Sequence, residues 1–270
     1  MLCFKNAQQI HHIDLLDRAF HYGDGCFTTA CIRNNQIELQ ERHLARLRMS
    51  SQKMNLQVDL ELIDATLQKL RETETTLNGT LKIIISRGMG QRGYSLPDHP
   101  ADLWVYYYPK TLEEHQFEQI ESGVLNTALG LCMPQLVGLK TLNRLEQVML
   151  KQEADQQGWV EALACDVQGE IVEGVSSNCF LRINNTWITP ELRYNGVSGV
   201  MRAEILERMH QQGIACEQRS LDMEEIPHIQ SLFFCNALSP MKMVTQFEQR
   251  TLDTEACIAL FHRLHLNQIS

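Results

Sequence analysis

The chain of 270 residues is 44% hydrophobic and 21% charged, a composition typical of a globular protein with one large domain or two smaller ones. Its net charge of -9 argues against a surface for nucleic acid or for anionic membranes. The first residues lack the apolar core of a signal peptide, and no apolar run reaches the length needed to cross a bilayer. The nine cysteines include no C-x-x-C pair, which favours buried thiols in a reducing cytoplasm and suggests no zinc site.

Hydrophobic patterns in the first half predict a small α/β domain that covers residues 1–109. The expected strands are 26–33, 36–39, 80–86 and 102–108, and the expected helices are about 41–54 and 59–73. On helix 41–54 the buried stripe is expected to consist of Leu44, Leu47, Ser51 and Met54. Arg46 lies off that stripe, a position typical of a solvated arginine.

Residues 88–93 read Gly-Met-Gly-Gln-Arg-Gly after a predicted strand, which is the pattern of a dinucleotide-binding turn. That turn requires a helix to begin at once, because the helix N-terminus binds the pyrophosphate. Pro97 and Pro100 follow closely and forbid a helix, so we reject the nucleotide-binding fold. This glycine loop (residues 88–96) carries Arg92 and Tyr94 and suits a lid over a carboxylate ligand. An ordinary surface loop is the alternative interpretation.

A polar segment, 110–119, is the predicted linker to a larger domain, 120–270. The strands expected there lie near 120–128, 160–166, 170–173, 178–183, 186–189, 214–219, 231–236 and 241–246. The expected helices are 141–157, 200–212 and 254–265, with Leu142, Leu145, Val148 and Met149 spaced for packing on the first of them. The whole chain is therefore expected to be an α/β (α+β) protein of two domains with mixed, largely antiparallel sheets.

Lys140 closes a segment, 122–139, in which no residue carries a formal charge. Lysine is strongly hydrated, so a lysine in this setting is a candidate for a desolvated amine that acts as a base or forms a Schiff base. Of the eight lysines, only Lys82 has comparably apolar neighbours. Lys82 lies in a predicted strand and can point outward to solvent. A solvated side chain is the plain alternative for both lysines.

A Schiff-base lysine suggests pyridoxal phosphate, which needs a carboxylate at its ring nitrogen and a cradle for its phosphate. Glu173 ends an apolar strand, where a partly buried carboxylate is costly unless a cation meets it. The start of helix 200–212 after Gly199 offers free N–H groups and the helix dipole to a phosphate, and Arg46 can add a charged fork. The alternatives are a surface glutamate at a strand end and a helix start without a ligand.

Several motifs, taken together and in this order, resemble those of the fold-type IV pyridoxal-phosphate enzymes. This family includes the D-amino acid and branched-chain aminotransferases and the 4-amino-4-deoxychorismate lyases, and the lyases are the most similar. The resemblance runs essentially from end to end, through segments 20–30, 43–47, 86–95, 139–148, 171–174, 177–180, 199–202 and 235–238.

The resemblance implies a role for each matching residue. Lys140 would hold pyridoxal 5'-phosphate and shuttle a proton, and Glu173 would face the ring nitrogen. The cofactor phosphate would be bound by Arg46, by the amides of Val200 and Met201, and by the segment that contains Asn236 and Ala237. Thr29 stands where a lyase is expected to place a hydroxyl near the substrate. We also assign Arg92 and Tyr94 to a substrate carboxylate.

The chain departs from the aminotransferases of this family at three positions. Thr28 stands where they have a glutamate, and Ala237 stands where they commonly offer a threonine or serine hydroxyl to the phosphate. Met243 occupies a position where relatives often have proline. Ala237 can therefore offer only its backbone N–H to the phosphate.

The resemblance therefore implies a lyase that converts 4-amino-4-deoxychorismate to 4-aminobenzoate and pyruvate, a step of folate biosynthesis. One alternative is an aminotransferase of the D-amino acid or branched-chain type on the same scaffold, against which Thr28, Thr29 and the pair 143–144 argue. A second alternative is a pyridoxal-phosphate-binding protein without turnover, against which the intact cofactor residues argue. The resemblance also implies a cytoplasmic homodimer with a small-molecule substrate.

Overall fold

The computed structural model describes all 270 residues and divides them into two compact units. Unit 1 consists of Met1–Glu113, Leu139–Asn143 and Ser270, and unit 2 of Glu114–Gly138 and Arg144–Ile269. The first break falls within the segment 110–119 that we expected to be the linker. The sequence assigned residues 139–143 to the second domain, whereas they pack with the first. They do so because their backbone binds along an edge of a strand in unit 1.

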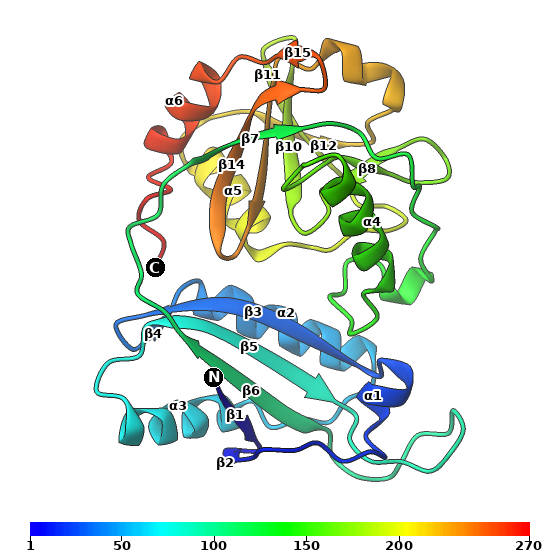
Figure 1. Cartoon of the computed structure of the whole chain (residues 1–270), viewed down its shortest axis with the longest axis vertical. Helices are drawn as coiled ribbons and strands as arrows, with labels where there is room; N and C mark the ends of the chain where they lie inside the picture. The colour runs from blue at the N-terminus through cyan, green and yellow to red at the C-terminus, as the bar shows by residue number, and fades with distance from the viewer. The chain divides into compact units, whose positions relative to one another are not determined.

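Unit 1 is built on a six-stranded sheet in which every neighbouring pair of strands is antiparallel. The strand order is β2-β1-β6-β5-β3-β4 (Figure 1). The strands are β1 (Leu2–Lys5), β2 (Gln8–Gln9), β3 (Gly25–Arg33), β4 (Gln36–Ile37), β5 (Gly79–Ser86) and β6 (Asp102–Pro109). The helices are α1 (Arg18–Tyr22), α2 (Gln40–Lys53) and α3 (Glu61–Thr73). Apolar residues of α2 and α3 form one core with one face of the sheet.

Side chains alternate between the two faces of this sheet, as the period of a strand requires. The odd-numbered residues of β5 from 81 to 85 are buried in the core with α2 and α3, so Lys82 lies on the opposite face. On β3, Thr28 shares the core face and is fully buried, whereas Phe27 and Thr29 share the face of Lys82. The two adjacent threonines of β3 therefore point to different surroundings.

Unit 2 contains a mixed sheet of seven strands with the order β12-β11-β10-β13-β14-β15, and β7 pairs with β14. The pairs β11–β12 and β14–β7 are parallel, and the other pairs are antiparallel. These strands are β7 (Glu118–Ser122), β10 (Asn178–Ile183), β11 (Thr186–Pro190), β12 (Cys216–Arg219), β13 (Ser231–Asn236), β14 (Ser239–Phe247) and β15 (Arg250–Thr251). A separate pair consists of β8 (Ala164–Cys165) and β9 (Ile171–Glu173). The predicted fold class, with mixed and largely antiparallel sheets, is confirmed.

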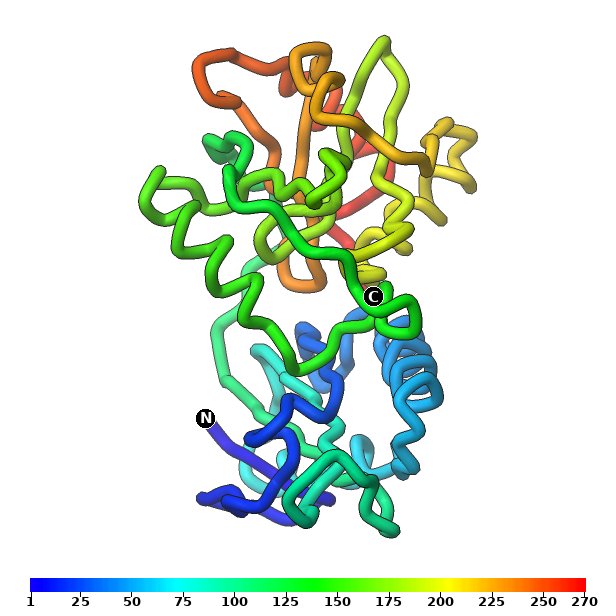
Figure 2. The backbone as a smooth tube through the Cα atoms, turned by 90° about the vertical axis from the view of Figure 1, so that its right-hand side faces the viewer, coloured from blue at the N-terminus to red at the C-terminus, as the bar shows by residue number.

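The helices of unit 2 are α4 (Leu145–Gln156), α5 (Val200–Gln211) and α6 (Glu255–Arg263), with short 3-10 helices at Pro134–Leu136 and Met223–His228. None of the chain's helices combines the length and apolar character that a membrane span needs. The last residue, Ser270, belongs to unit 1, where its carbonyl oxygen accepts a hydrogen bond of 3.0 Å from the N–H of Leu39 at the start of α2. Figure 2 marks this C-terminal end of the chain.

Two expectations about α4 are wrong. The helix was expected from 141, but it begins at Leu145 because the residues before it bind to β3. Leu145, Val148 and Met149, which were expected to pack inward, are 71%, 61% and 53% exposed. The buried residues of α4 are instead Leu150 and Ala154. The apolar stripe on this helix therefore remains on the surface of the chain.

Candidate active site

The backbone of Lys140 is fixed by the edge of β3 in unit 1. The carbonyl oxygen of Lys140 accepts a hydrogen bond of 2.9 Å from the N–H of Phe27, and the N–H of Leu142 donates to the carbonyl of Gly25 at 3.0 Å. Between these bonds, Thr141 forms an antiparallel bridge with Cys26. Sheet pairing of this kind fixes the register of Lys140 against β3, so its side chain begins at a defined position beside that strand.

The ammonium group of Lys140 lies over the ring of Phe27, with Nζ 4.9 Å from the ring centroid. Nζ of Lys82 lies 5.0 Å from the same centroid, so both candidate lysines reach one aromatic ring. Cation–π contacts of this kind stabilise a cation by about 0.5–1 kcal/mol at exposed sites. Thr29 pairs directly with Lys82 across the two strands and lies on the same face of the sheet. Thr29 and the Phe27 ring under Lys140 thus lie on the same face of the sheet.

Arg46 is buried, so the expectation of a solvated arginine is wrong. Its exposed fraction is 8%, and its Nη2 donates a hydrogen bond to Oγ1 of Thr28 on β3. Its Nε is buried without a hydrogen-bond partner. Burial lowers the pKa of Arg46 to about 10. The buried face of α2 is formed by residues 43, 46, 47, 50 and 51, most of which are polar, so hydrophobic periodicity could not reveal it.

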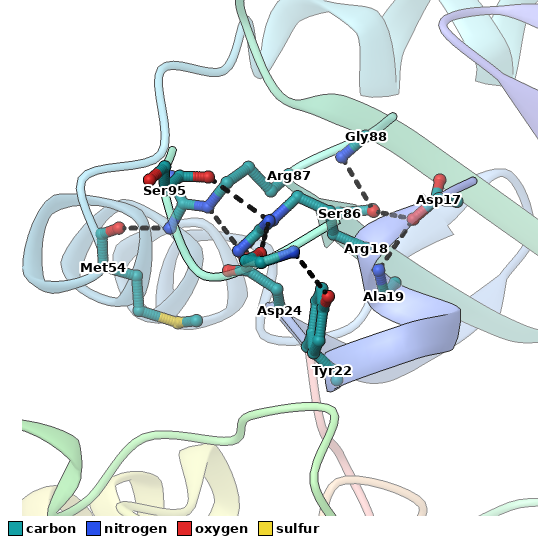
Figure 3. A network of polar contacts seen from close by, with 12 residues as sticks. Asp17, Arg18, Ala19, Tyr22, Asp24, Met54, Ser86, Arg87, Gly88 and Ser95 are labelled. Atoms are coloured by element: carbon teal, nitrogen blue, oxygen red, sulfur yellow. Dashed lines mark hydrogen bonds and ion pairs between the residues drawn. The ribbon is translucent and has the colours of Figure 1, made fainter. Parts of the chain in front are cut away.

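The glycine loop is anchored to α1 by a buried arginine that the sequence analysis missed (Figure 3). Nε of Arg18 donates to Oδ2 of Asp24 at 2.8 Å, and Nη1 donates to the carbonyl oxygens of Gly93 and Ser95 at 2.9 and 3.3 Å. The N–H of Gly93 donates to the hydroxyl of Tyr22 at 3.1 Å. Around this anchor, the loop exposes the side chains of Arg92 and Tyr94.

Replacement of Arg18 by methionine should release the glycine loop while keeping the apolar part of the side chain. We expect amide hydrogen exchange at residues 90–93 to become about tenfold faster or more, because each lost hydrogen bond contributes about 1 kcal/mol. Hydrogen–deuterium exchange with mass spectrometry measures this change. The matched control is Arg33→Met. It removes the ion pair between Arg33 and Glu38 at the far end of β3, which is similar in length to the one between Arg18 and Asp24. Unchanged protection of the loop in the Arg18 variant would contradict the assignment.

Glu173 is one of three buried carboxylates of unit 2, with Glu161 and Asp166. It ends β9 after two buried apolar residues and is itself only 6% exposed. Its Oε2 accepts hydrogen bonds from the N–H of Val197 at 2.9 Å and from Nδ2 of Asn178 at 3.4 Å. These donors fix the orientation of the carboxylate.

The start of α5 presents backbone N–H groups that have no acceptor within the helix. Gly199 is the N-cap residue and forms no side-chain hydrogen bond, and the amides of Val200 and Met201 belong to the first turn, which has no intrahelical acceptors. Both residues are buried. A Cβ atom at position 199 would overlap Oδ1 of Asn178, so only glycine fits there. This arrangement suits an anion bound to main-chain N–H groups.

The turn between β13 and β14 carries the other two residues that the sequence assigned to the phosphate. Oδ1 of Asn236 accepts hydrogen bonds of 3.0 Å from the N–H groups of Leu238 and Ser239, and its Nδ2 donates to Oγ of Ser177 at 3.1 Å. Asn236 therefore shapes the turn, in which Ala237 is half-buried. Met243 is fully buried and pairs with Phe233, so β14 accommodates it as an ordinary core residue.

The comparison with known proteins identifies relatives over almost the whole chain. The family model described as amino-transferase class IV matches residues 25–247. An aminodeoxychorismate lyase of Vibrio harveyi is 31% identical over 84% of this chain and 84% of its own, and a D-alanine aminotransferase of Bacillus licheniformis is 24% identical over 90% and 86%.

Two solved structures that resemble this chain belong to the same two classes of enzyme, lyases and aminotransferases. The crystal structure of 4-amino-4-deoxychorismate lyase from Pseudomonas aeruginosa has a TM-score of 0.87 to this chain, with 32% identity and 98% of both chains covered. A hypothetical aminotransferase from Mycobacterium tuberculosis in its PLP-bound form has a TM-score of 0.82 and 21% identity, with 99% of this chain and 98% of its own covered. The latter shows a shared fold.

Members of the class IV family depend on pyridoxal 5'-phosphate, as the sequence resemblance predicted. The residues present in each unit fit that cofactor. Unit 1 holds a lysine on a fixed strand edge and a buried guanidinium, Arg46, with an unpartnered Nε. Unit 2 holds a buried carboxylate, Glu173, and an uncapped helix start after a glycine that has no room for a side chain.

Proposed function

The chain belongs to the class IV aminotransferase family, and on that premise we propose that it is a lyase that converts 4-amino-4-deoxychorismate to 4-aminobenzoate and pyruvate. The similarity to two lyases above 30% identity supports this choice, whereas the aminotransferases named above are less than 25% identical. The observation that carries the proposal is the Thr28-Thr29 pair on β3. Thr29 places a hydroxyl on the sheet face bordered by Lys140, and Thr28 replaces the glutamate expected of an aminotransferase.

Five groups of this chain are proposed to hold pyridoxal 5'-phosphate. Lys140 would join the cofactor covalently, and Glu173 would keep its ring nitrogen protonated. The phosphate would be bound by Arg46, by the amides of Val200 and Met201, and by the turn of Asn236 and Ala237. When bound, the cofactor supplies an electron-withdrawing ring that stabilises negative charge at the carbon attached to the substrate nitrogen.

The side chains of unit 1 are proposed to handle the protons of the reaction. When the substrate nitrogen has taken the place of Lys140, the freed amine of Lys140 would remove the proton from the substrate carbon that bears the nitrogen. Thr29 donates a proton to the departing enolpyruvyl oxygen or orients a water that does so. Arg92 and Tyr94 hold a substrate carboxylate. Loss of pyruvate makes the six-membered ring aromatic, so the elimination is strongly downhill and the protein mainly orients groups and removes one proton.

The test separates the lyase from the aminotransferase alternative. A lyase needs no amino acceptor, because its cofactor returns to the starting form in each cycle. We expect the purified protein to release 4-aminobenzoate and pyruvate in equal amounts over many turnovers with no 2-oxo acid added. Both products are quantified by chromatography. Repeated turnover only in the presence of an amino donor and a 2-oxo acid together would favour the aminotransferase.

The proposed assembly is a homodimer in the cytoplasm. Apolar side chains exposed by each unit support the homodimer, since contiguous exposed apolar surface is typical of protein interfaces. In unit 1 they surround α1 and the glycine loop, and they are Ile13, Leu15, Leu16, Phe20, Met89, Tyr94 and Leu96. In unit 2 they include Leu145, Val148 and Met149, which lie together on α4. All nine cysteines are free thiols, which supports a reducing compartment.

A further inference from the structure

The guanidinium of Arg46 is a buried cation to which no carboxylate is bound. Its only hydrogen bond in the chain is the one from Nη2 to Oγ1 of Thr28, and its Nε has no partner. A buried charge without a counterion is costly, so this arrangement is expected only where an anion completes it. The partner that the chain does supply, a threonine hydroxyl, carries no charge.

The hydroxyl of Thr28 is held from its other side by a histidine. Nδ1 of His43 lies 2.6 Å from Oγ1 of Thr28, and His43 is one helical turn before Arg46 on the buried face of α2. A hydroxyl has one proton, and Arg46 has only donors. Thr28 therefore accepts from Arg46, and its own proton can be donated to Nδ1 of His43 when the neutral ring carries its proton on Nε2.

The surroundings of His43 keep its ring neutral. Burial and, after it, the charge of Arg46 lower the pKa of His43 to about 3, although Glu38 acts in the opposite direction. Nδ1 of the neutral imidazole can then accept a hydrogen bond from the Thr28 hydroxyl throughout the neutral pH range. A carboxylate at position 28 would instead offset the positive charge of Arg46 and so weaken its attraction for a bound anion.

We propose that Thr28 and His43 are positioning residues that orient the guanidinium of Arg46 toward a phosphate monoester without neutralising its charge. The buried chain from His43 through Thr28 fixes one edge of the planar guanidinium and leaves its charge without a carboxylate partner in the chain. This inference rests on the proposed role of Arg46 in binding the cofactor phosphate. It assigns a function to the residue that replaces the aminotransferase glutamate.

The test compares the binding of pyridoxal 5'-phosphate and of pyridoxal, which lacks the phosphate, to full-length protein freed of cofactor. We expect Thr28→Val to raise the dissociation constant for pyridoxal 5'-phosphate about tenfold, which corresponds to about 1.4 kcal/mol, and to leave that for pyridoxal unchanged. Inorganic phosphate should compete with the cofactor less well in the variant than in the wild type. His43→Leu should act in the same direction, because it removes the acceptor for the Thr28 proton.

Conservative variants keep this test independent of folding. Thr28→Ser retains the hydroxyl and should bind pyridoxal 5'-phosphate within about threefold of the wild type, since its hydrogen bonds can be remade. The control is Ser50→Ala, a buried position about one helical turn beyond Arg46 on α2, which should leave both dissociation constants unchanged. The ³¹P resonance of the holoenzyme gives a second readout. The dianion of the bound phosphate should persist to a lower pH in the wild type than in Thr28→Val.

Two results would overturn the inference. One is an unchanged affinity for pyridoxal 5'-phosphate in Thr28→Val. The other is an equal loss of affinity for pyridoxal and its phosphate, which would reduce Thr28 and His43 to supports of the fold. The proposed lyase activity fails on a different measurement, the absence of pyruvate release by the wild type, so the two failures can be told apart.

Discussion

Lys140→Ala should lose the covalent attachment of pyridoxal 5'-phosphate and, with it, almost all lyase activity. We expect the rate of product release to fall by at least about 10⁴-fold, because one amine both joins the cofactor and transfers the proton. Borohydride reduction of the wild type, followed by peptide mapping, should place the mass of the reduced cofactor on Lys140. The same treatment of the variant should label no lysine.

Lys82 provides the matched control, since its ammonium lies almost as close to the Phe27 ring as that of Lys140. Lys82→Ala should retain the covalent linkage and the visible absorbance of the bound cofactor. A label on Lys82 in the wild type, or a label on no lysine, would refute the assignment of Lys140.

Glu173→Gln should leave the fold intact and slow the chemical step by at least about 10²-fold, or about 2.7 kcal/mol of transition-state stabilisation. A neutral amide still accepts the hydrogen bond from Val197, but it cannot keep the ring nitrogen of the cofactor charged. The measurement is kcat under saturating substrate, with the thermal unfolding temperature as a check of the fold. The visible spectrum should still show bound cofactor.

A second glutamate of the same region serves as the control for this prediction. Glu170 is half-buried just before β9, where its Oε1 accepts a hydrogen bond of 3.0 Å from Ser220. Glu170→Gln should retain activity within about threefold, because this carboxylate bonds to Ser220 and has no proposed role in binding the cofactor. Wild-type turnover in Glu173→Gln would show that Glu173 is not the partner of the ring nitrogen.

Local patterns were sufficient to predict most elements of the fold. The apolar run of β5 and the Asn34-Asn35 turn, whose φ angles are 49° and 70°, depend mainly on residues adjacent in sequence. The extent of α4 was not predictable in this way. The residues just before Leu145 pair with β3 and so cannot be helical. That pairing joins parts of the chain that are far apart in sequence.

The candidate site was predictable where a residue's setting in sequence is unusual. Lys140 follows a long uncharged segment, and Glu173 ends an apolar strand, so both were visible without a structure. The burial of Arg46 was not visible, because its partner Thr28 lies on another element and its own face of α2 is polar. Arg18 was missed for the same reason, since its acceptors on the glycine loop come together only in the folded unit.

The attachment of residues 139–143 to β3 has a consequence for how the protein is made. On the ribosome, the chain of the N-terminal unit emerges long before the segment that completes the edge of its sheet. Until Lys140 has left the exit tunnel, the N–H of Phe27 and the carbonyl of Gly25 lack their final partners. A nascent chain stalled before residue 139 would therefore display an open sheet edge, which is a template for aggregation and a natural point of contact for chaperones.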